Sequence, residues 1–188
     1  MTVDKGSPPT TPRRGEPASA GGVAGFDVAP DRELRGRLCS CCAAEAWVEE
    51  MVAGRPYRSE AALYAASDHA TAELDARGLE QALAGHPRIG DAAPAHGDGR
   101  SAAWSKGEQA GVATAGADLL GELAAANAAY EQRFGHVYLV CASGRSAAEL
   151  LAVCQARLGN GPETERGVVL GELAKINRLR LGKLLEGR

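Results

Sequence analysis

Hydrophobic residues recur at helical spacing along most of the chain beyond residue 30, and Gly and Pro separate the segments. In the first half of this region the pattern predicts four helices, over residues 31–42, 43–53, 59–76 and 79–84. Gly54 and Pro56 end the second of these helices, and Gly85 ends the fourth.

The second half of the chain predicts three further helices, over residues 105–134, 146–158 and 162–185. Gly135 is placed as a C-terminal stop for the first of them. Ser146 and Glu149 have the spacing of a capping box at the start of the second. Pro162 opens the third, where its fixed backbone angle suits the first helical turn.

Two segments lack a helical period. Residues 85–104 are rich in Gly and Pro, which predicts a long loop, and long loops in compact domains are often functional. Residues 136–143 (HVYLVCAS) form an apolar run of strand length. One such run without a partner cannot make a sheet, so we expect a buried extended connector. The fold class predicted is all-α, a compact single-domain helical bundle.

The chain has 188 residues, which suits one domain with its own core. Residues 1–25 are rich in Pro, Gly, Ser, Thr and Ala and show no hydrophobic period, so we expect a disordered tail followed by a domain over 26–188. Hydrophobic residues make up 45% of the chain but aromatic residues only 4%, which favours closely spaced helices with small side chains.

The charge pattern limits the classes of partner. A net charge of −3 argues against nucleic acid, because phosphate binding needs a basic surface. No apolar run reaches the roughly 18 residues of a membrane span, and no apolar segment follows Arg13 and Arg14 as in a secretory signal. We therefore expect a cytoplasmic protein that contacts neither membrane nor nucleic acid.

The first candidate site is the sequence Ser105-Lys-Gly-Glu108-Gln109. Ser-x-x-Glu is the spacing of a capping box, and helix capping is the common explanation of such a pattern. If the helix is continuous, however, Glu108 falls on the same face as Val112, Leu119 and Leu123. A carboxylate on a buried face needs a partner, so a role in a site stays open beside the capping role.

The second candidate is Arg180, which lies on the apolar face of the last predicted helix, four residues after Ile176 and four before Leu184. Arg178 points away from this face. A buried arginine must pair with an anionic group. The partner is either a Glu of another helix, in a structural ion pair, or a carboxylate or ureido group of a substrate.

The third candidate is His86, whose backbone is restricted by Pro87. A loop histidine with a preset backbone is a candidate acid or base, although most loop histidines have no catalytic role. His69 and His96 are expected at the surface.

Cys39, Cys41 and Cys42 lie too close in sequence to bridge one another and lack the second half of a zinc motif. Small, reduced core residues are the expected interpretation, and no metal site is predicted. The sequence contains no nucleotide-binding GxGxxG before a helix, no GxxxxGK[ST] and no HExxH.

Five segments of the chain together resemble one family. They are CCAAEAWVEEMVAGRPY, GHPRIG, WSKGEQAG, YEQRFGHVYLVCASGRS and RLGN…E…ELAKINRLRL. They occur in the order found in the 2-oxo-4-hydroxy-4-carboxy-5-ureidoimidazoline (OHCU) decarboxylases, of bacterial type, and cover about residues 31–185. Each segment is weak evidence alone, but five in order are specific.

The resemblance implies an all-helical, generally dimeric enzyme that needs no cofactor and forms (S)-allantoin from a small ureidoimidazoline. It places a catalytic proton donor at His86 and a second catalytic residue at Glu108. It places substrate contacts at Pro87, Ser105, Lys106, Gly107, Gln109, Tyr138, Leu139, Val140, Cys141, Ala142 and Arg180. Gly107 departs from the bulkier polar residue common there, and the length of the loop between His86 and Ser105 varies within the family.

Two alternatives of another class stay open. A helical binding or regulatory module would explain the helices and the tail, and it would present an apolar face instead of a polar cleft. A thiol- or zinc-dependent enzyme would use the cluster Cys39, Cys41 and Cys42.

Overall fold

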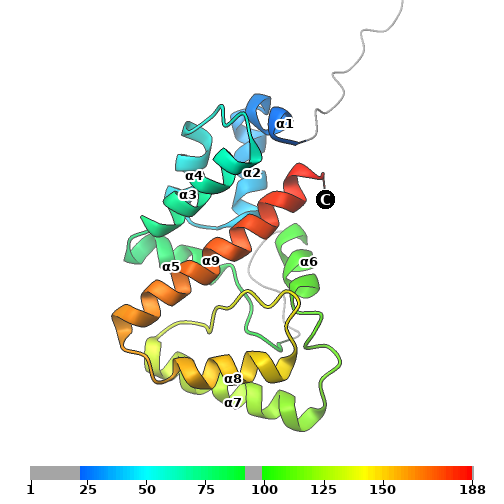
Figure 1. Cartoon of the computed structure of the whole chain (residues 1–188), viewed down its shortest axis with the longest axis vertical. Coiled ribbons are helices and arrows are strands. Elements are labelled where there is room, and N and C mark those ends of the chain that lie inside the picture. Colours follow the sequence, from blue (N-terminus) through cyan, green and yellow to red (C-terminus); the bar gives the residue numbers. More distant parts are fainter. Residues whose placement is uncertain (1–21, 92–98, 188) are drawn as a thin grey trace, which may run out of the picture.

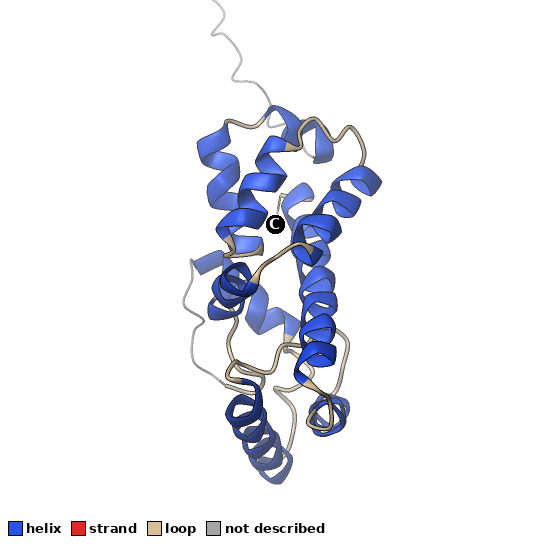
Figure 2. Ribbon diagram, turned by 90° about the vertical axis from the view of Figure 1, so that its left-hand side faces the viewer, coloured by secondary structure: helices blue, strands red, loops and turns tan. Residues whose placement is uncertain are grey.

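The computed structural model describes residues 22–91 and 99–187. Over these residues the chain forms helices and no strands (Figures 1 and 2). In chain order the helices are α1 (Gly22–Val28), α2 (Asp31–Cys41), α3 (Glu45–Ala53), α4 (Glu60–Ala72), α5 (Ala76–Ala84), α6 (Gly99–Glu108), α7 (Ala117–Phe134), α8 (Ala147–Arg157) and α9 (Pro162–Leu185). The all-α prediction is confirmed.

The long helix α9 runs through the molecule and packs against α1, α2 and α4 (Figure 1). Helices α2, α3, α4 and α5 pack side by side at one end, and α7 and α8 form a separate pair at the other. Across residues 22–91 and 99–187, no helix combines the length and apolar character that a bilayer crossing requires.

Two hydrophobic clusters form the core. The larger cluster is built by α1–α5 and α9, around Leu34, Trp47 and Leu173. The smaller is built by α7 and α8, around Leu123 and Leu150. The segment 137–142, which we call the connector, passes between the two clusters, and this position places it at the centre of the molecule.

The side chains of the connector alternate between the two clusters. Those that pack with the larger cluster are Val137, Leu139 and Cys141. Those in the smaller cluster are Tyr138, Val140 and Ala142. An extended backbone sends successive side chains to opposite sides, so the period of two in this apolar run now has a physical reason. The predicted buried extended connector is confirmed.

The helix ends follow the local sequence. The side chains of Ser59 and Asp75 each accept a backbone N–H three residues later, which caps α4 and α5. The predicted capping box of Ser146 and Glu149 is present at the start of α8. Gly135 ends α7 in the left-handed conformation, with φ of 78°, as glycine readily does.

The prediction of one helix over 105–134 is wrong. Helix α6 begins earlier, at Gly99, and therefore occupies part of the predicted loop 85–104; it ends at Glu108, and turns precede α7. Gly107, Gly111 and Gly116 weaken a continuous helix here, because glycine costs about 1 kcal/mol relative to alanine in a helix interior. Gly111 also lies against the Arg145 carbonyl, where a Cβ would stand 2.1 Å from the oxygen.

The predicted tail also ends earlier than expected. Residues 22–25 belong to α1, which buries Val23 and Phe26, and Phe26 meets the ring of Tyr57 edge-on at 5.9 Å. The remainder of the predicted tail, residues 1–21, lies outside the described residues, as does His96. The apolar positions in this first helix are too few to show a period in the sequence.

Gly111→Ala should lower the free energy of unfolding by about 1–3 kcal/mol, because the new methyl group must displace the Arg145 backbone. Gly121→Ala is the matched control: Gly121 lies within α7 with no atom near its missing Cβ, so alanine should stabilise the protein by about 0.5–1 kcal/mol. Urea denaturation of both variants measures these changes. Equal effects of the two substitutions would contradict the close packing at residue 111.

Candidate active site

A pocket opens where the two hydrophobic clusters meet. It encloses about 370 Å³ including its mouth, and four parts of the chain line it. These are the loop after α5 (His86, Pro87, Ile89), the end of α6 and the next residue (Ser105, Glu108, Gln109), the connector (Tyr138–Ala142) and α9 (Ile176, Leu179). Residues far apart in the sequence, such as His86 and Tyr138 at a separation of 52 positions, thus share one cavity.

Glu108 supplies the negative charge at the back of the pocket. Its carboxylate accepts hydrogen bonds from Arg180 Nε at 3.2 Å, Arg180 Nη2 at 2.9 Å and Lys183 Nζ at 3.0 Å. Burial raises the pKa of Glu108, but hydrogen bonds and charge from Arg180 and Lys183 outweigh that effect and hold the pKa below its usual range. Glu108 is therefore an anion at neutral pH.

Arg180 joins three helices behind Glu108, and its side chain is only 2% exposed. Besides the two bonds to Glu108, it donates to Ser105 Oγ at 3.0 Å. Its Nη1 donates to the carbonyls of Ser40 at 3.4 Å and Cys41 at 3.3 Å, at the end of α2. All five N–H donors of the guanidinium are thus used.

The sequence left two possible partners for Arg180, a glutamate of another helix or a group of the substrate. The partner in the structure is the glutamate Glu108, which itself lines the pocket. Arg180 does not line the pocket directly, so its predicted contact with substrate stays a prediction. Arg178 points the other way, as predicted, and pairs with Asp68 at the surface.

The capping interpretation of Ser105 and Glu108 is wrong. Ser105 lies inside α6, six residues after its start, so it faces no free helix end, and its hydroxyl accepts from Arg180. The argument that Glu108 is buried because it shares a helix face with Leu119 also fails, since α6 ends at Glu108. Glu108 is buried by packing against α9 instead.

His86 follows α5 directly, and its backbone N–H donates to Leu83 O at 3.0 Å, which fixes its position. Removal of the imidazole from water lowers the pKa of His86 to about 3, and the positive charge of Arg180 lowers it in the same direction. The negative charge of Glu108 opposes this shift. The imidazole is therefore neutral at physiological pH, and it can accept a proton.

Two amide side chains hold the loop that carries His86 in place. Gln109 accepts the N–H of Gly90 at 3.0 Å and donates to the Arg88 carbonyl at 3.4 Å. Asn127 donates to the Ile89 carbonyl at 2.8 Å. The side-chain amide of Gln109, a predicted substrate contact, is thus hydrogen-bonded to the loop, and Gln109 also lines the pocket.

Besides Arg180, the predicted site residues Lys106 and Gly107 also lie outside the pocket lining. Both are exposed on α6 and neither is part of the pocket lining. Ser105 and Glu108 are three residues apart and share a face of the helix, whereas positions 106 and 107 lie on other faces, and Gly107 has no side chain.

Several residues of the site escaped the sequence analysis. Lys183 binds Glu108, and its position three residues after Arg180 on the same helix face could have indicated this. Ile89, Ile176 and Leu179 line the pocket. Leu179 is 40% exposed at the pocket, and the sequence pattern does not mark it as a site residue.

The charges at the back of the pocket sum to a positive value. Glu108 contributes −1 and Arg180 and Lys183 contribute +2, so the cluster carries +1 while His86 is neutral. A partly buried excess of one positive charge suits a ligand with one negative charge.

The cysteine cluster lies apart from the pocket lining. Cys41 and Cys42 are buried and Cys39 is exposed, and all are free thiols. Burial raises the pKa of Cys42 to about 11 and that of Cys41 further, which disfavours the reactive thiolate. Within the described chain, no three His, Cys, Asp or Glu side chains lie together in a way that could hold a metal ion. His69 is exposed, as predicted.

Arg180→Met should lower the free energy of unfolding by about 3–5 kcal/mol, because it leaves two carbonyls without their donor and the buried Glu108 carboxylate with Lys183 as its remaining partner. Arg178→Met is the matched control on the same helix; its exposed pair with Asp68 should cost less than about 1 kcal/mol. Denaturation curves at pH 7 measure both. A loss for Arg180→Met as small as for the control would show that the buried pair does not hold α6 to α9.

The low pKa of His86 predicts a pH dependence of stability. The unfolded chain binds a proton at His86 near pH 6.5 and the folded chain only near pH 3, so the unfolded state binds more protons in this window. The stability of the wild-type protein relative to His86→Asn should therefore fall as pH falls from 6.5 to 4. A difference that stays constant would contradict the neutral, buried imidazole.

Comparison with known proteins gives a consistent result. The family model for OHCU decarboxylase matches residues 27–182. The chain is 32% identical over 149 residues to the uric acid degradation bifunctional protein TTL of Arabidopsis thaliana, covering 79% of this chain and 46% of that protein. It is 31% identical over 150 residues to the 2-oxo-4-hydroxy-4-carboxy-5-ureidoimidazoline decarboxylase of Amia calva, covering 79% and 82%.

Solved structures agree with the family match. A crystal structure of OHCU decarboxylase in the presence of (S)-allantoin superposes with a TM-score of 0.68 at 30% identity, over 84% of this chain and 99% of that chain. A crystal structure of (S)-allantoin synthase shares the fold, with a TM-score of 0.62 at 19% identity, over 85% and 52%. This chain spans about half of that enzyme and of the Arabidopsis protein. The bacterial type of the motifs stays a prediction. Because the family model matches most of the length of this chain, the chain belongs to the OHCU decarboxylase family.

Proposed function

We propose that this chain decarboxylates 2-oxo-4-hydroxy-4-carboxy-5-ureidoimidazoline to (S)-allantoin, a step of urate degradation. The observation that carries the proposal is the pocket that brings together His86 and Glu108, with Arg180 behind them, from three distant parts of the sequence. The Amia calva relative carries the name of this activity, and (S)-allantoin was present with the most similar solved structure described above.

The substrate can supply its own electron sink. Its carboxylate sits on a ring carbon that also bears a hydroxyl, and the neighbouring ring carbon carries the ureido group and takes part in a C=N bond. When the bond to the carboxylate breaks, CO₂ leaves and the electron pair enters the C=N unit, so that the ring nitrogen takes up a proton and an enol remains. The enol hydroxyl then gives up its proton as the ureido-bearing carbon gains one on a single face.

His86 is the residue proposed to move these protons. As a neutral imidazole it can accept the hydroxyl proton, and the imidazolium so formed can deliver a proton to carbon. Its position beside Glu108 supports this role, because the carboxylate favours the protonated imidazole.

The remaining pocket residues are proposed to bind and orient the ring. The positive excess of Arg180 and Lys183 over Glu108 suits the single negative charge of the substrate carboxylate. Pro87, Ser105, Gln109 and the connector then fix the ring relative to His86. Orientation matters because the substrate also decays unaided, so that the gains of the enzyme are rate and handedness.

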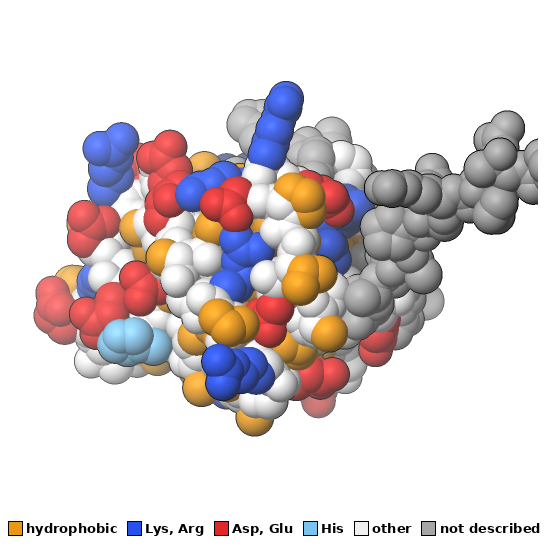
Figure 3. Space-filling model, turned by 90° about the horizontal axis from the view of Figure 1, so that it is seen from above, with side chains coloured by type: hydrophobic (Ala, Val, Ile, Leu, Met, Phe, Trp, Pro, Cys, Tyr) orange, Lys and Arg blue, Asp and Glu red, His pale blue; other side chains and the backbone are white. Residues whose placement is uncertain are grey.

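We also propose that the protein is cytoplasmic, as the sequence pattern led us to expect, and that it is a homodimer, as the resemblance implies. Nucleic acid is not proposed as a partner: on the face drawn in Figure 3, basic and acidic side chains are interspersed and form no basic stripe. A binding module without catalysis is the competing function, and the polar groups of His86, Glu108 and Gln109 gathered in one pocket favour the enzyme, since a module would present an apolar face at these residues.

The activity is tested by generating the substrate in place from urate, with a urate oxidase and a hydroxyisourate hydrolase, and following circular dichroism. The wild-type protein should give a fast signal of one allantoin enantiomer. His86→Asn should lose this signal by at least about 100-fold, because it removes the proton-transfer group, while its fold is kept.

His69→Asn is the matched control, since His69 is exposed on α4 and outside the pocket, and it should behave as wild type. Decay by the wild-type protein at the spontaneous rate, to racemic product, would defeat the proposal. Near-normal turnover by His86→Asn would defeat the assignment of His86.

A further inference from the structure

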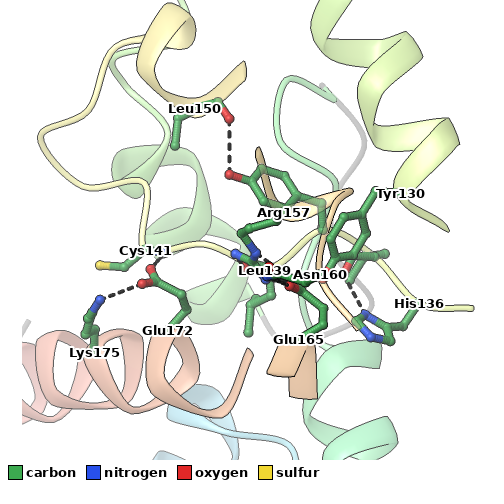
Figure 4. A network of polar contacts seen from close by, with 12 residues as sticks. Tyr130, His136, Leu139, Cys141, Leu150, Arg157, Asn160, Glu165, Glu172 and Lys175 are labelled. Carbon is green, nitrogen blue, oxygen red and sulfur yellow. Dashed lines mark hydrogen bonds and ion pairs between the residues drawn. The ribbon is translucent and has the colours of Figure 1, made fainter. Parts of the chain in front are cut away.

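The connector contributes backbone to the pocket, and two charged side chains outside the pocket hold it in place. Residues 138–142 line the pocket, whereas Arg157 of α8 and Glu172 of α9 do not. Both of these charged side chains are buried, and both bind the connector backbone. Figure 4 shows them reaching Leu139 and Cys141 from neighbouring helices.

The first anchor is Arg157, whose Nη1 donates to the Leu139 carbonyl at 2.7 Å. A buried cluster fixes its guanidinium: Glu165 accepts from Nε at 2.8 Å, and Glu165 is bound in turn by Tyr130 and Asn160. The guanidinium also lies over the ring of Tyr138, 5.0 Å from its centre. A buried ion pair is weak evidence for stability, but it is a rigid anchor.

The second anchor is Glu172, whose Oε2 accepts the N–H of Cys141 at 2.8 Å. Its other oxygen accepts from Lys175, one turn further along α9. Leu139 and Cys141 are two residues apart, and in an extended chain their backbone groups lie along the same edge. The two anchors therefore occupy one edge of the connector.

Val140, between them, turns its N–H and C=O to the opposite edge. Among the described residues neither group has a hydrogen-bond partner, although Val140 is buried. Buried backbone groups are nearly always paired, so a free pair that lines a pocket is available to a ligand. A ureido group or a ring amide offers both a donor and an acceptor to such a pair.

We propose that Glu172 and Arg157 are positioning residues, which hold the connector so that the peptide groups of Val140 face the substrate. The inference rests on the proposed function for the identity of the substrate. It adds two charged residues, outside the pocket, that set the orientation of the ring through the backbone. Neither residue touches the reacting atoms.

Glu172 gives the sharper test, because removal of the buried Arg157 would disturb the whole Tyr130–Glu165 cluster. Glu172→Ala removes the acceptor for Cys141, while Glu172→Gln keeps an oxygen there and removes the charge. Arg178→Ala is the matched control, since it removes another ion pair of α9, at the surface and away from the connector. Thermal unfolding verifies that all three variants are folded.

With substrate generated in place, Glu172→Ala should lower kcat/KM by about tenfold, with a rise in KM, and should form a measurable share of the other allantoin enantiomer. Glu172→Gln should restore both to within about twofold of wild type, since it can still accept the hydrogen bond. The control should match wild type. A purely structural role would lower the amount of active protein and leave KM and the enantiomer ratio unchanged.

A second readout does not depend on activity. Amide hydrogen exchange at Cys141 should be about tenfold faster in Glu172→Ala than in wild type, and unchanged in Glu172→Gln and the control. Unchanged exchange in Glu172→Ala would overturn the inference even if the wild-type protein were inactive. An inactive wild type with faster exchange in this variant would overturn the proposed function and uphold the anchoring of the connector.

Discussion

The buried guanidinium of Arg180 is the interaction on which the site depends. It binds the last carbonyls of α2, the hydroxyl of Ser105 and the carboxylate of Glu108, and so ties α2 and α6 to α9. Without it Glu108 would keep Lys183 as its remaining partner, and less positive charge would compensate its burial. One side chain thus fixes both the geometry and the charge at the back of the pocket.

The electrostatic state of His86 follows from the same arrangement. A histidine beside an arginine in a partly buried site is neutral, and the nearby Glu108 favours its protonated form. An arriving anion would add to the effect of Glu108 and raise the affinity of the imidazole for a proton. The binding of an anion and the basicity of His86 are therefore coupled, which suits the proposed reaction, in which a carboxylate is lost and a carbon is then protonated.

The connector shows how a single extended segment can serve a helical protein. Its side chains fill two separate hydrophobic clusters, Arg157 and Glu172 hold its backbone at Leu139 and Cys141, and residues 138–142 line the pocket. The connector thus makes contacts through its side chains on both sides and through its backbone. The α7–α8 pair, which packs little against the rest of the helices, is joined to them through this segment (Figure 1).

The sequence by itself determined the helical class, most helix ends and the connector, because these depend on local signals: the period of apolar residues, the caps at Ser146 and Gly135, and an apolar run without a partner. It also marked Arg180, since a charge on an apolar face needs an explanation. Only the tertiary structure decided that helix α6 ends at Glu108, because Gly111 packs against a backbone segment 34 residues away. It alone paired Glu108 with Arg180 and Lys183, left Lys106 outside the pocket and set Glu172 on the connector. These contacts join residues far apart in the chain, and a local pattern carries no information on which distant groups will meet.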